Sequence, residues 1–141
     1  MPDGKERIEN MLDLSNFSSQ MGIQLQETGE GYAVCTLDLK ENFENAYGTT
    51  HGGVTYSLAD TTVAAVLVGD LESDRVVSTI EGKLNYLRAA DPDEVNRLIC
   101  RGEVEHLGSS TAVVGVEIRD DQDRKLNKGL FTFALHSSES E

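Results

Sequence analysis

One acidic residue stands apart from the others in this chain because it lies in an otherwise apolar segment. Asp60 is the single charged residue in the run from Val54 to Val68, VTYSLADTTVAAVLV, which is long enough for a buried helix. A carboxylate there is unfavourable unless it has a partner or faces a cavity, and no Arg or Lys lies within one helical turn. Asp60 is therefore a candidate catalytic carboxylate. The alternative is that it points to solvent or is satisfied by a remote backbone group.

The second candidate is the segment directly before that helix. Gly52 and Gly53 follow His51, and glycine lets the backbone approach a ligand closely. The first N–H groups of a helix are unpaired and carry the positive end of its dipole, which suits an anion or a developing oxyanion. A Gly-Gly pair is more often only a turn. Neither GxGxxG nor GxxxxGK[ST] occurs, so a nucleotide phosphate is not the expected ligand.

The elements that must position these residues form an α+β pattern. A short helix over residues 3–14, with Asp3 and Glu6 as a capping-box pattern, precedes a polar break. The long helix covers 54–68 and stops at Gly69. Strands are predicted over residues 23–25, 32–39, 76–87, 95–107, 111–119 and 125–135. The last three strands predict an antiparallel meander, and an antiparallel sheet wrapped around the long helix is the simplest way to bury it.

Length and charge limit the possible partners. The 141 residues fit a single domain, 1–141, with a tail over 137–141 that is expected to fray. A net charge of −13 argues against nucleic acid and against an anionic membrane surface. We interpret the excess as a solvated acidic coat, with adaptation to high salt left open. The charged N-terminus lacks a signal-peptide core and no apolar run reaches membrane-spanning length, so a cytoplasmic location is expected.

The remaining reactive side chains indicate no further chemistry. Cys35 and Cys100 are expected to be buried free thiols, with a disulfide or redox role as the minor alternative. The three histidines are widely separated and show no metal-ligand spacing. Neither a metal ion nor a cofactor is expected.

The motifs together resemble a known family. The pattern Asn45-x5-His51-Gly52-Gly53, then Leu58-Ala59-Asp60, is similar to that of the hotdog-fold thioesterases, and TIEGKLNYLR over 79–88 extends it. The nearest branch is the PaaI-like acyl-CoA thioesterases of phenylacetate degradation. The resemblance implies a hotdog fold, an antiparallel sheet wrapped around one long central helix. It also implies hydrolysis of an acyl-CoA thioester to free acid and CoA.

The resemblance implies a role for each residue of the pattern. Asp60 takes the position of the catalytic carboxylate, which activates water as a general base or attacks the thioester directly. Gly52 takes the position whose backbone N–H polarises the thioester carbonyl, and Gly53 beside it is assigned to substrate binding. Asn45 matches a side chain that binds the carbonyl or positions water. His51 is expected to shape the loop rather than to exchange protons.

A hydroxyl on the following strand completes the implied site. Thr79 falls where some relatives place a Ser or Thr that orients the water, and Ser78 is the rival if the register shifts by one residue. Ala64, one turn after Asp60, stands where another branch has a catalytic Thr. The polyanionic CoA needs local cations, and the candidates are Arg88, Arg124, Lys125 and Lys128. Each of these is otherwise an ordinary surface charge.

The spacing of the two main residues predicts an oligomer. Gly52 lies eight residues before Asp60, which is about 12 Å along a helix. One thioester carbon cannot contact both, because reacting atoms must approach to about 3–3.5 Å. We therefore expect active sites shared between subunits, in a homodimer at minimum and a dimer of dimers as the larger assembly. Two other functions stay open here: a non-catalytic acyl-CoA-binding hotdog sensor, and an acyl-CoA hydratase or dehydratase, whose His–Asp or His–Glu motifs are not found.

Overall fold

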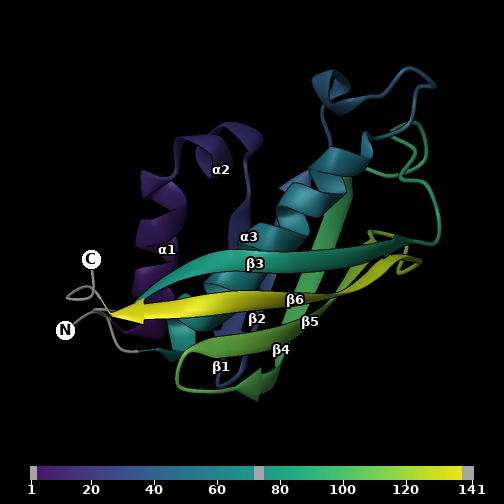
Figure 1. The fold of residues 1–141 in the computed structure, drawn as a ribbon. Helices are drawn as coiled ribbons and strands as arrows, with labels where there is room; N and C mark the ends of the chain where they lie inside the picture. Colours follow the sequence, from purple (N-terminus) through teal and green to yellow (C-terminus); the bar gives the residue numbers. More distant parts are fainter. Residues whose placement is uncertain (1–2, 72–74, 138–141) are drawn as a thin grey trace.

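The computed structural model describes residues 3–71 and 75–137, and its centre is a long helix inside a curved antiparallel sheet (Figure 1). This helix, α3, spans Gly52–Asp70. The strands are β1 (Gln24–Gly29), β2 (Tyr32–Asp38), β3 (Arg75–Tyr86), β4 (Arg97–Leu107), β5 (Thr111–Asp120) and β6 (Lys125–Ser137). They form one sheet in the order β1-β2-β4-β5-β6-β3. The predicted α+β architecture, with a sheet around one helix, is confirmed.

One side of α3 packs against the inner face of the sheet. Its buried residues are Thr55, Leu58, Ala59, Thr62, Val63, Ala65, Val66 and Leu67. Opposite them, β5 buries every second side chain from Ala112 to Ile118, as expected for a strand with one face on the core. The apolar sequence predicted a helix buried on all sides, but the structure buries only one side of it. Asp60 lies on its half-buried side, which faces the outermost part of the sheet at β3.

Short polar side chains begin the first two helices. Asp3 accepts a hydrogen bond of 2.9 Å from the Glu6 N–H at the start of α1 (Gly4–Leu14), as the capping pattern predicted. The polar break predicted after this helix is wrong. Ser15 caps a second helix, α2 (Asn16–Met21), since its hydroxyl accepts a backbone N–H of the first turn. A short 3-10 helix over residues 41–43 lies in the loop before α3.

The end of α3 is set by its contact with α1. The predicted stop at Gly69 is wrong, because the helix continues to Asp70 and Leu71 caps it. Gly69 is needed for close approach instead: a Cβ there would lie 2.9 Å from Cδ1 of Ile8. The Arg7 guanidinium donates to three carbonyls at this helix end, where the dipole favours a cation. The N-terminal helix is thereby fastened to α3.

The order of the strands in the sheet differs from their order in the sequence. The predicted meander is present as β4-β5-β6, but β3 pairs with β6 and forms one edge of the sheet. Its side chains Val76 and Ile80 are 50% and 58% exposed. The strand β6 extends through Ser137, and the rest of the tail that was predicted to fray lies outside the described residues.

The two cysteines are buried free thiols, as predicted. Cys35 on β2 lies directly opposite Cys100 on β4 in the register of the sheet. Burial raises the pKa of Cys35 to about 11 and that of Cys100 to about 12. Within residues 3–71 and 75–137, no His, Cys, Asp and Glu side chains cluster as a metal site would need. None of the described helices is long and apolar enough to cross a membrane.

Candidate active site

Asp60 has a hydroxyl partner across the helix–sheet interface. Its Oδ1 accepts a hydrogen bond of 2.7 Å from Oγ1 of Thr79 on β3. The carboxylate is half-buried, so it is neither hidden in the core nor free in solvent. A short O–H···O⁻ contact fixes the orientation of a carboxylate without neutralising it. Asp60 is thus a fixed and accessible carboxylate.

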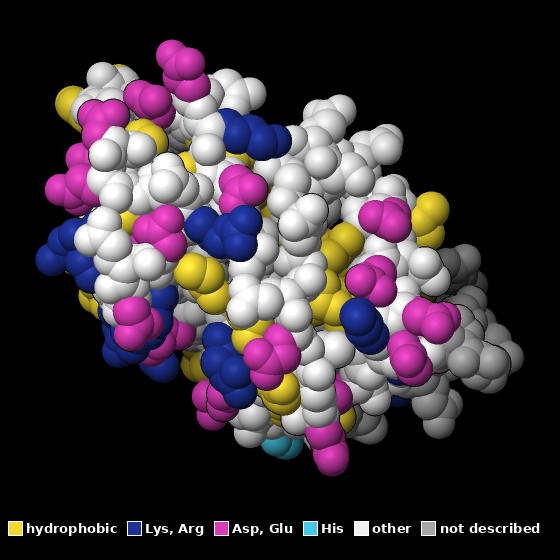
Figure 2. Space-filling model, turned by 180° about the vertical axis from the view of Figure 1, so that it is seen from behind, with side chains coloured by type: hydrophobic (Ala, Val, Ile, Leu, Met, Phe, Trp, Pro, Cys, Tyr) yellow, Lys and Arg dark blue, Asp and Glu magenta, His cyan; other side chains and the backbone are white. Residues whose placement is uncertain are grey.

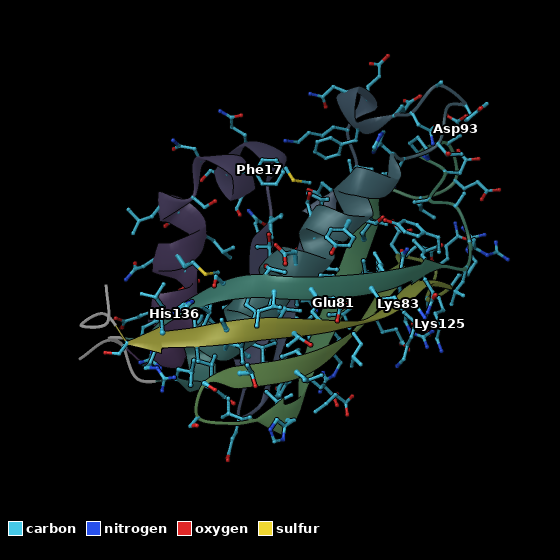
Figure 3. The ribbon with its side chains drawn as sticks, viewed as in Figure 1. Phe17, Glu81, Lys83, Asp93, Lys125 and His136 are labelled. Atoms are coloured by element: carbon cyan, nitrogen blue, oxygen red, sulfur yellow. The ribbon has the colours of Figure 1, made fainter. Side chains whose placement is uncertain are left out.

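The strand register separates the two hydroxyls that the sequence left as rivals. Side chains alternate along a strand, so Thr79 and Ser78 point to opposite faces of β3. Thr79 reaches Asp60, whereas Ser78 lies with its Oγ 2.9 Å from Nε2 of His136. His136, near the end of β6 (Figure 3), is exposed and directly follows the buried Leu135, so it lies on the face of the strand opposite the core. The structure therefore pairs Thr79, and not Ser78, with the carboxylate.

A cavity of about 230 Å³ adjoins Asp60. It lies between α1, α2, α3 and the neighbouring strands β3 and β6. Its lining residues are Met11, Ser15, Ser18, Asp60, Thr61, Ala64, Val77, Ser78, Thr79 and Phe133. A larger hollow of about 470 Å³ lies on the outer face of the sheet, with a rim of charged residues of both signs, and neither Asp60 nor Gly52 lines it. Of these two cavities, the smaller is therefore the one that Asp60 lines.

The start of α3 offers one unused amide. The Gly53 N–H donates to Nδ1 of His51 at 2.8 Å, and the Val54 N–H donates to the His51 carbonyl at 2.9 Å. Among the described residues, the Gly52 N–H finds no acceptor. Of the two glycines predicted at the site, Gly52 therefore presents a free donor, and Gly53 is occupied by His51. His51 is the N-cap residue of the helix through this contact.

Sequence reasoning missed Tyr86. Its hydroxyl donates to the Gly52 carbonyl at 2.6 Å, and Oγ1 of Thr55 donates to the same oxygen at 2.9 Å. No motif in the sequence marks this contact, because it joins the end of β3 to the start of α3. The tyrosine within the segment that resembles the family was the one available signal.

Asn45 holds the loop before α3 in shape. Its Oδ1 accepts the N–H groups of Tyr47 and Thr49 at 2.8 and 3.2 Å. Its Nδ2 donates to Oγ1 of Thr49 at 2.9 Å. In a single chain the Asn45 amide therefore serves the turn over residues 45–49.

Three of the four predicted phosphate-binding cations are held by acidic neighbours. Arg124 pairs with the buried Asp120 at 2.8 Å, while Lys125 and Lys128 lie 3.3 and 3.7 Å from Glu117. Arg88, just after β3, makes no ion pair within the described part of the chain. Figure 3 places Lys125 toward the end of the β3–β6 pair where β3 finishes. Figure 2 shows acidic side chains spread over one face, with Lys and Arg between them.

The pairing at Asp120 also affects its ionisation. Burial alone would raise the pKa of this carboxyl, but hydrogen bonds from the backbone and side chain of Arg124 and from the Gln122 N–H outweigh it. The pKa of Asp120 is therefore lowered. Arg124 is a structural residue of this hairpin in the single chain.

Comparison with known proteins identifies the family. The Thioesterase superfamily model matches residues 47–127. The acyl-coenzyme A thioesterase PaaI of Escherichia coli is 30% identical over 105 residues, covering 74% of this chain and 71% of that protein. The 1,4-dihydroxy-2-naphthoyl-CoA hydrolase of Listeria monocytogenes is 27% identical over 115 residues, covering 82% and 91%.

Solved structures show the same fold. The E. coli PaaI protein of the phenylacetic acid degradation operon superposes with a TM-score of 0.83 at 22% identity, over 95% of this chain and 92% of that one. A hypothetical thioesterase with coenzyme A from Streptococcus pneumoniae gives a TM-score of 0.73 at 26% identity, over 84% and 88%. The hotdog fold predicted from the motifs is confirmed. The chain belongs to the thioesterase superfamily and is a thioester hydrolase.

Proposed function

We propose that this chain hydrolyses acyl-CoA thioesters to the free acid and CoA. The observation that carries the proposal is the pair of groups on α3, an amide without an acceptor at Gly52 and a carboxylate held by Thr79 at Asp60. The Gly52 N–H binds the thioester carbonyl oxygen and stabilises the negative charge that develops on it. In one route Asp60 takes a proton from a water molecule whose oxygen attacks the carbonyl carbon, the C–S bond breaks, and CoA leaves as the thiolate and is protonated. In the other the Asp60 carboxylate attacks and displaces the CoA thiolate, and water then hydrolyses the resulting mixed anhydride to the free acid and Asp60.

Two subunits are needed to build one such site. The eight-residue spacing keeps Gly52 and Asp60 of one chain about 12 Å apart, so the carbonyl contacts Gly52 of one subunit and Asp60 of another. The free edge of β3, with its exposed Val76 and Ile80, is the surface that supports this pairing. We propose a homodimer as the minimum and a dimer of dimers as the larger assembly. Sedimentation of an active enzyme as a monomer would overturn this.

The acyl group is proposed to occupy the cavity beside Asp60. Met11, Ala64, Val77 and Phe133 give it an apolar lining, and Asp60 is the one acidic residue among the residues that line it. A carboxylate on the acyl group would meet the negative charge of Asp60 without a cation to offset it. At about 230 Å³ the cavity suits a compact, uncharged acyl group. Replacing Ala64 by Leu should reduce turnover of bulky acyl-CoAs more than that of acetyl-CoA, and an unchanged preference would refute this placement.

Arg88 is the cation that we assign to a CoA phosphate. It lies two residues after Tyr86, at the end of β3 that contacts the start of α3, and it has no acidic partner among the described residues. The pantetheine arm would then run from this end of the sheet toward Gly52. Arg88→Gln should raise KM for acyl-CoA and weaken its dependence on salt, with kcat retained.

Release of free thiol from a panel of acyl-CoAs tests the proposed reaction. Asp60→Asn should lower kcat at least about 100-fold with an unchanged circular dichroism spectrum. Asp70→Asn is the matched control on the same helix, because its Oδ1 accepts the Gly31 N–H and an Asn oxygen can still do so. Wild-type turnover by Asp60→Asn would refute the assignment. A change in enoyl absorbance without thiol would indicate hydration, and saturable binding without either product would indicate a sensor.

A further inference from the structure

Tyr86 makes two contacts with Gly52 from the end of β3. Its hydroxyl donates to the Gly52 carbonyl at 2.6 Å. Its ring lies against the α-carbon of the same residue, since a Cβ on Gly52 would be 3.3 Å from Cε2 of Tyr86. Tyr86 is 54% exposed, so burial in the core does not explain the contact. Tyr86 therefore contacts Gly52, the residue whose N–H we assign to the thioester carbonyl oxygen.

The peptide between Gly52 and Gly53 is held at both ends. Its carbonyl accepts from Tyr86 and from Thr55, and its N–H donates to Nδ1 of His51. A Gly-Gly step at a helix start is otherwise the most freely rotating part of the backbone. The Gly52 N–H belongs to the preceding His51–Gly52 peptide, whose carbonyl accepts from the Val54 N–H at 2.9 Å. The two peptides share the Gly52 α-carbon, so the Tyr86 contacts restrict how the Gly52 N–H can turn. An oxyanion donor must lie 2.7–3.1 Å from where the charge develops, so its direction matters for the rate.

We propose that Tyr86 is a positioning residue that aims the Gly52 amide at the thioester carbonyl. This inference rests on the proposed function, in which that amide binds the carbonyl oxygen. Tyr86 acts through the Gly52 peptide and not on the substrate. Its loss should therefore lower kcat while KM is retained, since a misplaced donor weakens the transition state more than the bound substrate.

The same strand also supports the other half of the chemistry. Thr79, seven residues before Tyr86 on β3, holds Asp60. In the proposed dimer, Gly52 and Asp60 of one chain serve different active sites. Each β3 therefore supports two sites: one through Tyr86, which contacts Gly52, and the other through Thr79, which contacts Asp60. Damage at Tyr86 should impair the site that uses Gly52 of that chain and spare the site that uses its Asp60.

Tyr86→Phe tests the inference, because it keeps the ring against Gly52 and removes only the hydroxyl. We expect kcat to fall about 5- to 20-fold with KM within about twofold and the melting temperature nearly unchanged. Tyr32→Phe is the matched control, since it removes a tyrosine hydroxyl that donates to Glu27 at 2.7 Å in the β1–β2 hairpin. It should keep wild-type kcat. A raised KM with unchanged kcat would make Tyr86 a substrate-binding residue and overturn the proposal.

Mixed oligomers supply the second readout. Chains with Asp60→Asn and chains with Tyr86→Phe, carrying different affinity tags, are co-expressed and the mixed dimers are purified. One of the two sites then combines an intact Gly52–Tyr86 contact with an intact Asp60, so about half of the wild-type activity should return. Activity no higher than the mean of the two parents would overturn the division of Tyr86 and Asp60 between sites.

The two proposals fail in different ways. A wild-type chain that releases no thiol from any acyl-CoA refutes the proposed function. Normal turnover by Tyr86→Phe, in an enzyme that Asp60→Asn inactivates, refutes only the role of Tyr86.

Discussion

The hydrogen bond between Thr79 and Asp60 leads to the sharpest prediction for a single side chain. Replacing Thr79 by Val keeps the shape of the residue and the β-branched preference of the strand, but removes the hydroxyl that donates to Asp60 at 2.7 Å. The carboxylate then loses the contact that fixes its direction. We expect slower turnover by a protein that folds normally.

The size of the effect follows from the exposure of the pair. A hydrogen bond to a charged group contributes about 1.5–3 kcal/mol when it is well protected. Thr79 is exposed and Asp60 half-buried in the single chain, so competition from water places the loss near 1–1.5 kcal/mol. At about 1.4 kcal/mol for each factor of ten, kcat should fall about 5- to 12-fold.

The assay is thiol release under saturating acyl-CoA, with two variants for comparison. Thr79→Ser retains a hydroxyl and should recover most of the activity. Thr28→Val is the matched control, because it removes a threonine hydroxyl on β1 that donates to the Tyr32 carbonyl at 3.1 Å and does not line the cavity. If Thr79→Val stays within twofold of wild type, or if Thr28→Val loses as much, the placement of Thr79 beside the catalytic carboxylate is wrong.

Three predictions concern the rest of the chain. Asn127 is 1% exposed and neither amide atom has a hydrogen-bond partner among the described residues, so Asn127→Leu should raise the free energy of unfolding in urea by about 1–3 kcal/mol; a loss of stability would mean that the amide is satisfied. Because the pKa of Asp120 is lowered, its stabilising contribution is present above the unfolded value and lost as pH falls through the folded one. The stability advantage of wild type over Asp120→Asn, followed by thermal melts, should therefore shrink below about pH 4, and a constant difference down to pH 2 would contradict this. With pKa values of about 11 and 12 and full burial, Cys35 and Cys100 should resist Ellman's reagent at pH 8 in the native protein and react in urea; rapid labelling of the native protein would refute their burial.

Local rules account for the parts of the fold that were predicted well. The capping of α1 by Asp3, the alternation of β5 and the turns of the meander depend on residues close together in sequence. Of the predictions that failed, one depends on a distant contact and the other on a local helix cap that was not recognised. Gly69 reads as a helix stop, but the helix runs past it, and the buried Ile8 of α1 packs so closely that a Cβ on Gly69 would force it to shift. The serines after α1 read as a break, although Ser15 caps a new helix there.

At the active site, too, the sequence determined some features and the tertiary structure decided others. The sequence by itself determined that Asp60 is the lone charge of an apolar segment, that Gly52 and Gly53 directly precede it, and that the spacing from Gly52 to Asp60 is too long for one substrate carbon. These follow from composition and from the fixed rise of a helix. Only the tertiary structure decided that Thr79 rather than Ser78 meets Asp60, and that Tyr86 holds Gly52. Both contacts depend on β3 pairing with β6 at the sheet edge beside α3, and a pairing between segments so far apart leaves no local signal.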